Sequence, residues 1–189
     1  MDRCQISGFI LAGGKSSRMG TDKAMLSFCG KPLLKHICDL IEPFCVEVIV
    51  SGYRDEYESL GMKILPDLYA NIGPISGIYS ALRYSTTEWT LIVSVDTPMI
   101  NCELLEFLIS NKESFESVVP THDSGLEPLI ALYNRSALPS VKEMIDTENY
   151  RIADLLSRIN TNELDCSDLV GKFPQLFLNL NRMEDYLSV

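Results

Sequence analysis

Short apolar runs along the chain alternate with segments whose apolar residues recur every three or four positions. The run Cys4–Leu11 predicts a strand, and Val46–Val50 (VEVIV) and Trp89–Val95 (WTLIVSV) predict two more. Between the first two strands, Pro32–Phe44 carries leucines and isoleucines at helical spacing, and Pro32 suits the first turn of a helix. The pattern therefore predicts strands and helices that follow one another along the chain.

The remaining segments continue this alternation. We expect strands at Met62–Leu65 and Leu176–Leu180, a short polar helix near Arg54–Leu60, a helix at the C-terminus, and further helices at Pro74–Tyr84, Asn101–Ile109, Ala137–Ile145 and Ile152–Arg158. Two more strands, Ser117–Pro120 and Leu126–Tyr133, flank the turn residues His122–Gly125 and predict a small antiparallel excursion.

Apolar strands that alternate with helices are typical of a mostly parallel sheet flanked by helices on both faces. The 189 residues contain no internal repeat, low-complexity tract or linker, so we expect a single α/β domain over residues 1–189. No apolar run approaches the about 18 residues typical of a membrane span, and the apolar stretch Gly8–Ala12 is too short for a signal peptide.

Composition narrows the class of partner. Apolar residues make up 46% of the chain and charged residues 22%, as in soluble globular proteins. The formal net charge of −10 argues against nucleic-acid partners and against binding to an anionic membrane surface. A small anionic ligand is compatible with it, because the local charge of a site can oppose the net charge. The six cysteines show no CxxC spacing, so we interpret them as reduced thiols of a cytoplasmic protein.

One glycine-rich segment, LAGGKSSRMGTDKAML at residues 11–26, concentrates positive charge in this acidic chain. Gly13 and Gly14 allow backbone amides to approach phosphate groups closely, and Lys15, Arg18 and Lys23 add cations. The segment matches neither GxxxxGK[ST] nor GxGxxG. It predicts a phosphate-binding loop, and an ordinary glycine turn with solvated cations is the alternative.

Polar residues follow the other predicted strands. Ligands of open α/β sheets bind outside the carboxyl ends of the strands, where Ser51, Asp67 and Asp96 are expected. A carboxylate at the end of a strand suits Mg²⁺, which usually binds one or two carboxylates together with phosphate oxygens. Asp96 therefore predicts a magnesium ligand, with a turn or capping aspartate as the alternative.

These residues resemble a known family. The segment LAGGKSSRMGTDK is similar to the nucleotidyltransferase signature LAGG-x-S-x-RMG-x-DK, and within that superfamily the chain resembles the MobA family of molybdenum cofactor guanylyltransferases. The similarity continues at residues 66–67, 72–77, 95–98, 128–133 and 178–181. The resemblance implies a single Rossmann-like α/β domain, in agreement with the alternation of strands and helices.

The resemblance also implies the reaction of the family. Its enzymes transfer GMP from GTP to the terminal phosphate of molybdopterin, release pyrophosphate, form the guanine dinucleotide cofactor and require Mg²⁺. The implied partners are GTP, a molybdopterin-type phosphorylated acceptor and, transiently, proteins of cofactor synthesis or molybdoenzyme maturation. The acceptor phosphate has a second pKa of about 6, so it is mostly ionised near neutral pH and needs no general base.

The resemblance also assigns roles by motif. Together with the glycine pair, it implies nucleotide binding by Leu11, Ala12, Gly13, Gly14, Lys23, Ser51, Asp67 and Asp96. Asp96 matches the magnesium ligand, and Arg18 and Lys23 are expected to assist catalysis by stabilising phosphate charge. Asp67 suits the N1–H and N2–H₂ donors of guanine. Ser51 stands where the family often has asparagine. Asn179 and Asn181 match a segment near metal and substrate, although Asn181 also suits a helix N-cap.

Two other functions remain open on the sequence. Relatives that use CTP tend to read LAAG and DQP, so Gly13 and Thr97 favour GTP over CTP, while another small phosphorylated acceptor stays compatible with the motifs. A non-catalytic nucleotide-binding accessory protein predicts the loss of Lys23 or Asp96, and this chain has both.

Overall fold

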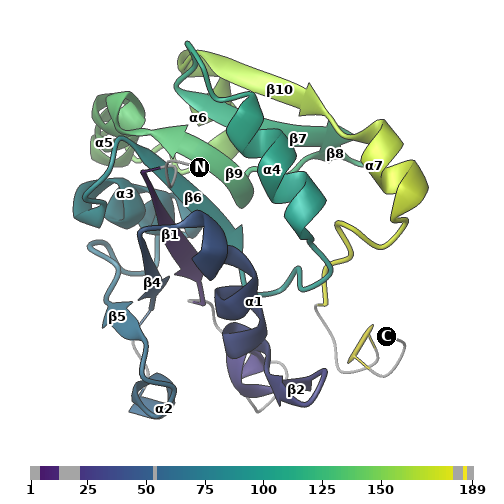
Figure 1. The fold of residues 1–189 in the computed structure, drawn as a ribbon. Coiled ribbons are helices and arrows are strands. Elements are labelled where there is room, and N and C mark those ends of the chain that lie inside the picture. Colours follow the sequence, from purple (N-terminus) through teal and green to yellow (C-terminus); the bar gives the residue numbers. More distant parts are fainter. Residues whose placement is uncertain (1–4, 13–21, 53–54, 181–184, 187–189) are drawn as a thin grey trace.

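The fold was analysed in a computed structural model that describes residues 5–12, 22–52, 55–180 and 185–186 (Figure 1). Its strands are β1 Ile6–Leu11, β2 Ser27–Phe28, β3 Lys31–Pro32, β4 Glu47–Ser51, β5 Lys63–Leu65, β6 Trp89–Ser94, β7 Ser117–His122, β8 Gly125–Leu126, β9 Ile130–Asn134 and β10 Thr161–Asp165. Its helices are α1 Leu33–Ile41, α2 Asp55–Glu58, α3 Pro74–Tyr84, α4 Cys102–Ser110, α5 Leu138–Asp146, α6 Ile152–Arg158 and α7 Ser167–Lys172, with short 3₁₀ turns η2 Lys23–Met25, η3 Glu42–Phe44 and η4 Arg135–Ala137.

The main sheet has the strand order β10-β7-β9-β6-β1-β4-β5. The pairs β6–β1, β1–β4, β4–β5 and β10–β7 are parallel, whereas β9 runs antiparallel to β6 and β7. The short β8 adds a hairpin to β7, and β2 pairs with β3 in a separate two-stranded sheet. The sheet is therefore mostly parallel with a small antiparallel part, as predicted.

Helices cover both faces of the sheet. One core cluster joins α1 and α4 to the sheet, and a second joins α3, α5 and α6 to the opposite face. In Figure 1, α1 and α4 lie in front of the strands. All six residues of β1 and of β6 are buried. Because these strands are covered on both faces, their sequences are apolar runs instead of alternating patterns.

One predicted strand is wrong. Residues 174–177 form a turn and 178–180 are irregular, so Leu176–Leu180 is not a strand. The side chains of Leu176 and Leu180 are buried, which produced the apolar pattern. The amide of Leu180 donates to the carbonyl oxygen of Asp96 at 2.8 Å, outside any strand ladder. At the predicted terminal helix only residues 185–186 are described, and they are helical.

Other boundaries also differ from the expectation. The predicted strand Leu126–Tyr133 is divided into β8 and β9 by a turn at residues 127–129, because Pro128 has no amide hydrogen for a ladder. β10 was not expected: its sequence TNELD lies at the edge of the sheet and is polar and partly exposed, without the apolar alternation that marks a strand.

None of the helices in the described ranges combines the length and apolar character that crossing a membrane requires. The five cysteines in those ranges are unpaired. Burial, and to a smaller extent the neighbouring Cys38, raises the pKa of Cys45 to about 12, so this thiol stays protonated near neutral pH.

Candidate active site

The register of the sheet brings the predicted strand ends together. Leu11 is paired with Ser94 on one side and with Ser51 on the other, and Ser51 is paired with Leu65. The next residues continue the row, because the amide of Ala12 donates to the carbonyl of Ser51 at 3.1 Å. Four parallel strands therefore end level with one another, so the residues that follow them meet at one edge.

A cleft of about 730 Å³ lies along this edge. Four of the predicted nucleotide-binding residues line it: Leu11, Ser51, Asp67 and Asp96. The loop before α3 and the start of that helix form one wall, which includes Tyr69, Gly73 and Gly77. Gly77 allows a close approach: a Cβ built there would lie 2.8 Å from Cδ2 of Leu11. A larger residue at this position would force the side chain of Leu11 to shift.

Asp67 is held by Ser51, which stands where the family often has asparagine. The buried hydroxyl of Ser51 donates to Oδ1 of Asp67. Ser51 therefore orients the carboxylate from the end of the neighbouring strand. The second oxygen of Asp67 has no hydrogen-bond partner within the described ranges, which suits a carboxylate that accepts from a ligand.

Asp96 stands at the end of β6 and lines the cleft. Its Oδ1 accepts from the hydroxyl of Ser94 at 2.6 Å and from the hydroxyl of Thr97 at 3.4 Å. Both of these bonds end on the same oxygen. Oδ2 accepts no hydrogen bond from the described part of the chain. The donor set therefore orients the carboxylate and leaves one oxygen for a cation or another ligand.

Lys23 does not line this cleft in the described part of the chain, but its turn is tied to the same edge. Asp22 caps η2, the turn that begins with Lys23, by accepting from the amide of Ala24 at 3.2 Å. The fully buried Tyr57 donates from its hydroxyl to Oδ2 of Asp22 at 2.6 Å, and this hydroxyl also lies 3.5 Å from the carbonyl oxygen of Ala12. Tyr57 thus links Ala12 and Asp22, two described residues of the glycine-rich segment.

Tyr57→Phe is expected to lower the free energy of unfolding by about 1.5–3 kcal/mol, because it removes a hydrogen bond to a charged, partly buried carboxylate. The matched control is Tyr133→Phe, which removes an equally buried hydroxyl that donates to the neutral carbonyl of Pro128 at 2.9 Å. It should cost about 1 kcal/mol. Urea unfolding compares the two variants, and equal losses would contradict the charged partner that we assign to Tyr57.

The C-terminal segment approaches the same edge. Asn179 is exposed and immediately precedes Leu180, whose amide binds the backbone of Asp96. Burial raises the pKa of Tyr186 to about 12, and the negative charges of Asp96 and Asp22 add to this effect. Within the described ranges its buried hydroxyl has no hydrogen-bond partner.

Some predicted residues lie outside the described ranges. These are Gly13, Gly14, Lys15, Arg18 and Asn181. The sequence reasoning also missed Tyr57, which lies in a short polar helix far along the chain from its hydrogen-bond partner Asp22. Only the three-dimensional contact identifies it.

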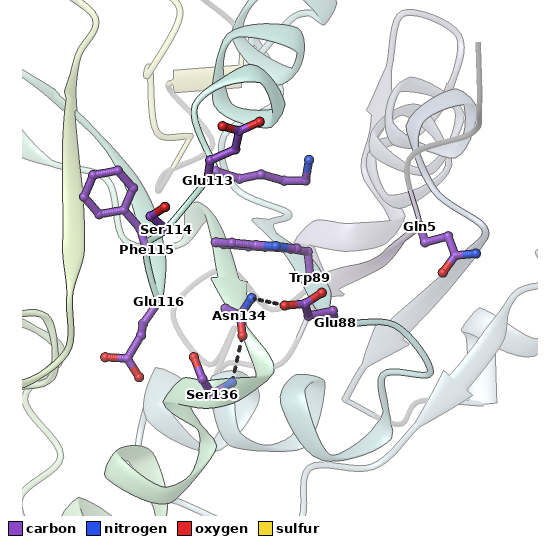
Figure 2. A pocket seen from close by; sticks show the side chains of 10 residues that line it. Gln5, Glu88, Trp89, Glu113, Ser114, Phe115, Glu116, Asn134 and Ser136 are labelled. Carbon is purple, nitrogen blue, oxygen red and sulfur yellow. Dashed lines mark hydrogen bonds between the residues drawn. The ribbon is translucent and has the colours of Figure 1, made fainter.

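A second hollow of about 600 Å³ lies at the opposite end of the strands (Figure 2). Trp89, the first residue of β6, extends across it, and Gln5 precedes β1. Asn134 donates to Glu88 at 3.2 Å and accepts from the amide of Ser136 at 2.9 Å. These two hydrogen bonds cap the turn after β9, so we assign Asn134 a structural role.

The fold and the sequence are similar to those of known proteins. Molybdopterin-guanine dinucleotide biosynthesis protein A from Archaeoglobus fulgidus superposes with a TM-score of 0.81 at 27% identity, over 96% of this chain and 95% of that chain. A probable molybdenum cofactor guanylyltransferase of Flavobacterium johnsoniae is 37% identical over 182 residues, 96% of this chain and 88% of the relative. The molybdenum cofactor guanylyltransferase of Vibrio parahaemolyticus is 32% identical over 186 residues, 96% of this chain and 93% of the relative.

The level strand ends, the cleft beside them and this structural neighbour define a nucleotidyltransferase with a Rossmann-like α/β fold. Residues 8–163 match the model of the MobA-like NTP transferase domain. The chain belongs to this family and is a nucleotidyltransferase enzyme.

Proposed function

We propose that the protein transfers GMP from GTP to the terminal phosphate of molybdopterin and releases pyrophosphate. The observation that carries the proposal is that Asp67 and Asp96 line one cleft from strand ends on either side of Leu11. Three strand spacings, about 14 Å, separate the two strands that these residues follow. A separation of that order suits an extended nucleotide whose base lies at one carboxylate and whose phosphates lie at the other.

At the base end, Asp67 supplies the acceptor that guanine requires. Guanine presents N1–H and N2–H₂ on one edge, and a carboxylate accepts from both donors. The hydroxyl of Ser51 donates to one oxygen of this carboxylate and so fixes its orientation. Cytosine has no donor at the corresponding ring nitrogen, so the same carboxylate discriminates against CTP.

At the phosphate end, the chemistry of Asp96 fits Mg²⁺. The described residues contain no cluster of three or more metal-ligating side chains. A single oriented carboxylate instead matches the way Mg²⁺ binds through one or two carboxylates and substrate phosphates. We propose that Asp96 holds this ion, which, when bound, neutralises charge on the phosphate oxygens.

The transfer then needs positioning and charge neutralisation more than proton chemistry. An oxygen of the acceptor phosphate attacks the α-phosphorus of GTP, the new O–P bond forms, and the bond to the pyrophosphate oxygen breaks. Lys23 and Arg18 are proposed to stabilise the charge that collects on the leaving group. We propose that the acceptor enters from the β9 side of the cleft, where Leu129 forms part of the lining.

The wider setting follows from the same proposal. We infer one domain over the whole chain, since Leu176 packs into the same core cluster as α1 and α4. We also propose a cytoplasmic enzyme that receives its acceptor from, and passes its product to, other proteins of the cofactor pathway.

A nucleotide panel tests the base assignment. In thermal-shift measurements with Mg²⁺, a ligand at 100 times its Kd adds about 2.7 kcal/mol of stability, which raises Tm by roughly 5–10 °C for a chain of this size. GTP should produce this shift, while CTP, UTP and ATP at the same concentration should produce little. A shift with CTP and none with GTP would overturn the guanine assignment.

A further inference from the structure

Helix α3 carries two buried serines on the side that faces the Asp67 loop, defined here as residues 67–73. Ser76 and Ser80 are 2% and 1% exposed, and their spacing of four places them on one helix face. Their neighbours on the helix are mostly apolar core residues. A buried hydroxyl in such surroundings costs free energy unless it forms hydrogen bonds, so the partners of these serines matter.

Both partners lie in the two residues directly after Asp67. The amide of Leu68 donates to the hydroxyl oxygen of Ser80 at 2.8 Å. The hydroxyl of Ser76 accepts from the amide of Tyr69 at 3.2 Å and donates to the carbonyl oxygen of Tyr69. The side chains of Ser76 and Ser80 therefore form hydrogen bonds with backbone groups of Leu68 and Tyr69 that lie beyond the end of β5.

Backbone conformation and an aromatic contact also shape the Asp67 loop. Asn71 and Gly73 adopt the left-handed region, with φ of 64° and 79°, so the chain turns sharply before α3. The ring of Tyr69 meets the ring of Tyr79 edge-on, with centroids 5.3 Å apart. With the bond from Ser51 to the carboxylate, serine hydroxyls on α3 and β4 hold the loop at three consecutive residues.

We propose that Ser76 and Ser80 are specificity-positioning residues for the base of the nucleotide. They fix the backbone beside Asp67, so that its carboxylate meets the paired N–H donors on the edge of a purine. This inference rests on the proposed function. Recognition of two donors at once requires the acceptor to be held within about 0.5 Å, so a loosened loop loses discrimination before it loses binding.

The test compares the Kd values of GTP and inosine triphosphate, which lacks the 2-amino donor. We expect wild-type protein to prefer GTP by at least about tenfold, the effect of one hydrogen bond to a charged acceptor. Ser76→Ala combined with Ser80→Ala should reduce that preference to below about threefold, with kcat at saturating GTP changed less than about threefold. If the double variant does not fold, Ser80→Ala alone replaces it in the test, and we expect its preference for GTP to lie between those of wild type and of the double variant.

The matched control is Ser85→Ala. Ser85 is also 2% exposed and follows α3 at its other end, where its hydroxyl donates to the carbonyl of Thr87. It should keep the wild-type preference for GTP. A loss of preference in this control as large as in the Ser76 and Ser80 variant would overturn the inference, because it would report general loosening of the helix.

A double-mutant cycle separates the inference from the function on which it rests. In an Asp67→Ala background the serine substitutions should leave the ratio of the two Kd values unchanged, since they act through that carboxylate. Serine variants with the full wild-type preference would overturn the positioning role alone. Wild-type protein without a preference, or Asp67→Ala with its preference intact, would overturn the guanine assignment and the inference together.

Discussion

Asp96→Asn is expected to lower kcat for guanylyl transfer by about 1,000-fold at saturating Mg²⁺. Asparagine keeps the shape of the side chain and an oxygen that accepts from the hydroxyls of Ser94 and Thr97. It removes the negative charge that we propose holds the cation beside the phosphates. Pyrophosphate release measures the loss, and the thermal midpoint without ligand should stay close to that of wild type.

The chain offers a closely matched control for this substitution. Asp165 stands at the end of β10 and accepts from the hydroxyl of Ser167, two residues away, at 2.6 Å, the same distance as between Ser94 and Asp96. It is exposed and is not part of the cleft lining. Asp165→Asn should therefore retain activity. Undiminished turnover in Asp96→Asn would remove the proposed metal role.

Lys23→Ala is expected to reduce kcat/KM for GTP by about 100-fold, since a positioned cation on phosphate is worth a few kcal/mol in the transition state. The turn that carries Lys23 is fixed by Asp22 and Tyr57, so the backbone should keep its course when the side chain is shortened. Steady-state kinetics with GTP as the varied substrate give the result.

Lys35→Ala is the control for the loss of a lysine. Lys35 lies on α1 and forms an ion pair with Asp39 at 2.8 Å, away from the cleft. Its removal should leave kcat/KM within about twofold of wild type, because exposed ion pairs contribute little. If both lysine variants behaved alike, Lys23 would have no contact with the phosphates.

The sequence predicted the parts of the site that lie at strand ends. Apolar runs locate β1, β4 and β6, and parallel strands necessarily end at one edge, so Asp67 and Asp96 were expected near each other. The register then made Leu11 the centre of the row. The strands were predicted correctly because burial on both faces leaves a strong local pattern in the sequence.

The parts that sequence reasoning missed depend on contacts between distant segments. Tyr57 is an aromatic residue in a four-residue helix, and its bond to Asp22 spans 35 positions. Ser76 and Ser80 occur in a helix whose pattern is explained by core packing alone. The segment Leu176–Leu180 was wrongly predicted to be a strand. Buried leucines in an irregular segment give the same apolar spacing as a strand.

The central claim is tested most directly by following the α-phosphate of GTP. Protein is incubated with Mg²⁺, GTP labelled at the α-phosphorus and purified molybdopterin, and the pterin products are separated and counted. We predict that label enters the pterin fraction in a one-to-one ratio with the pyrophosphate released. Label that stays in GTP, while CTP labelled in the same way transfers its phosphorus to the pterin, would contradict the account.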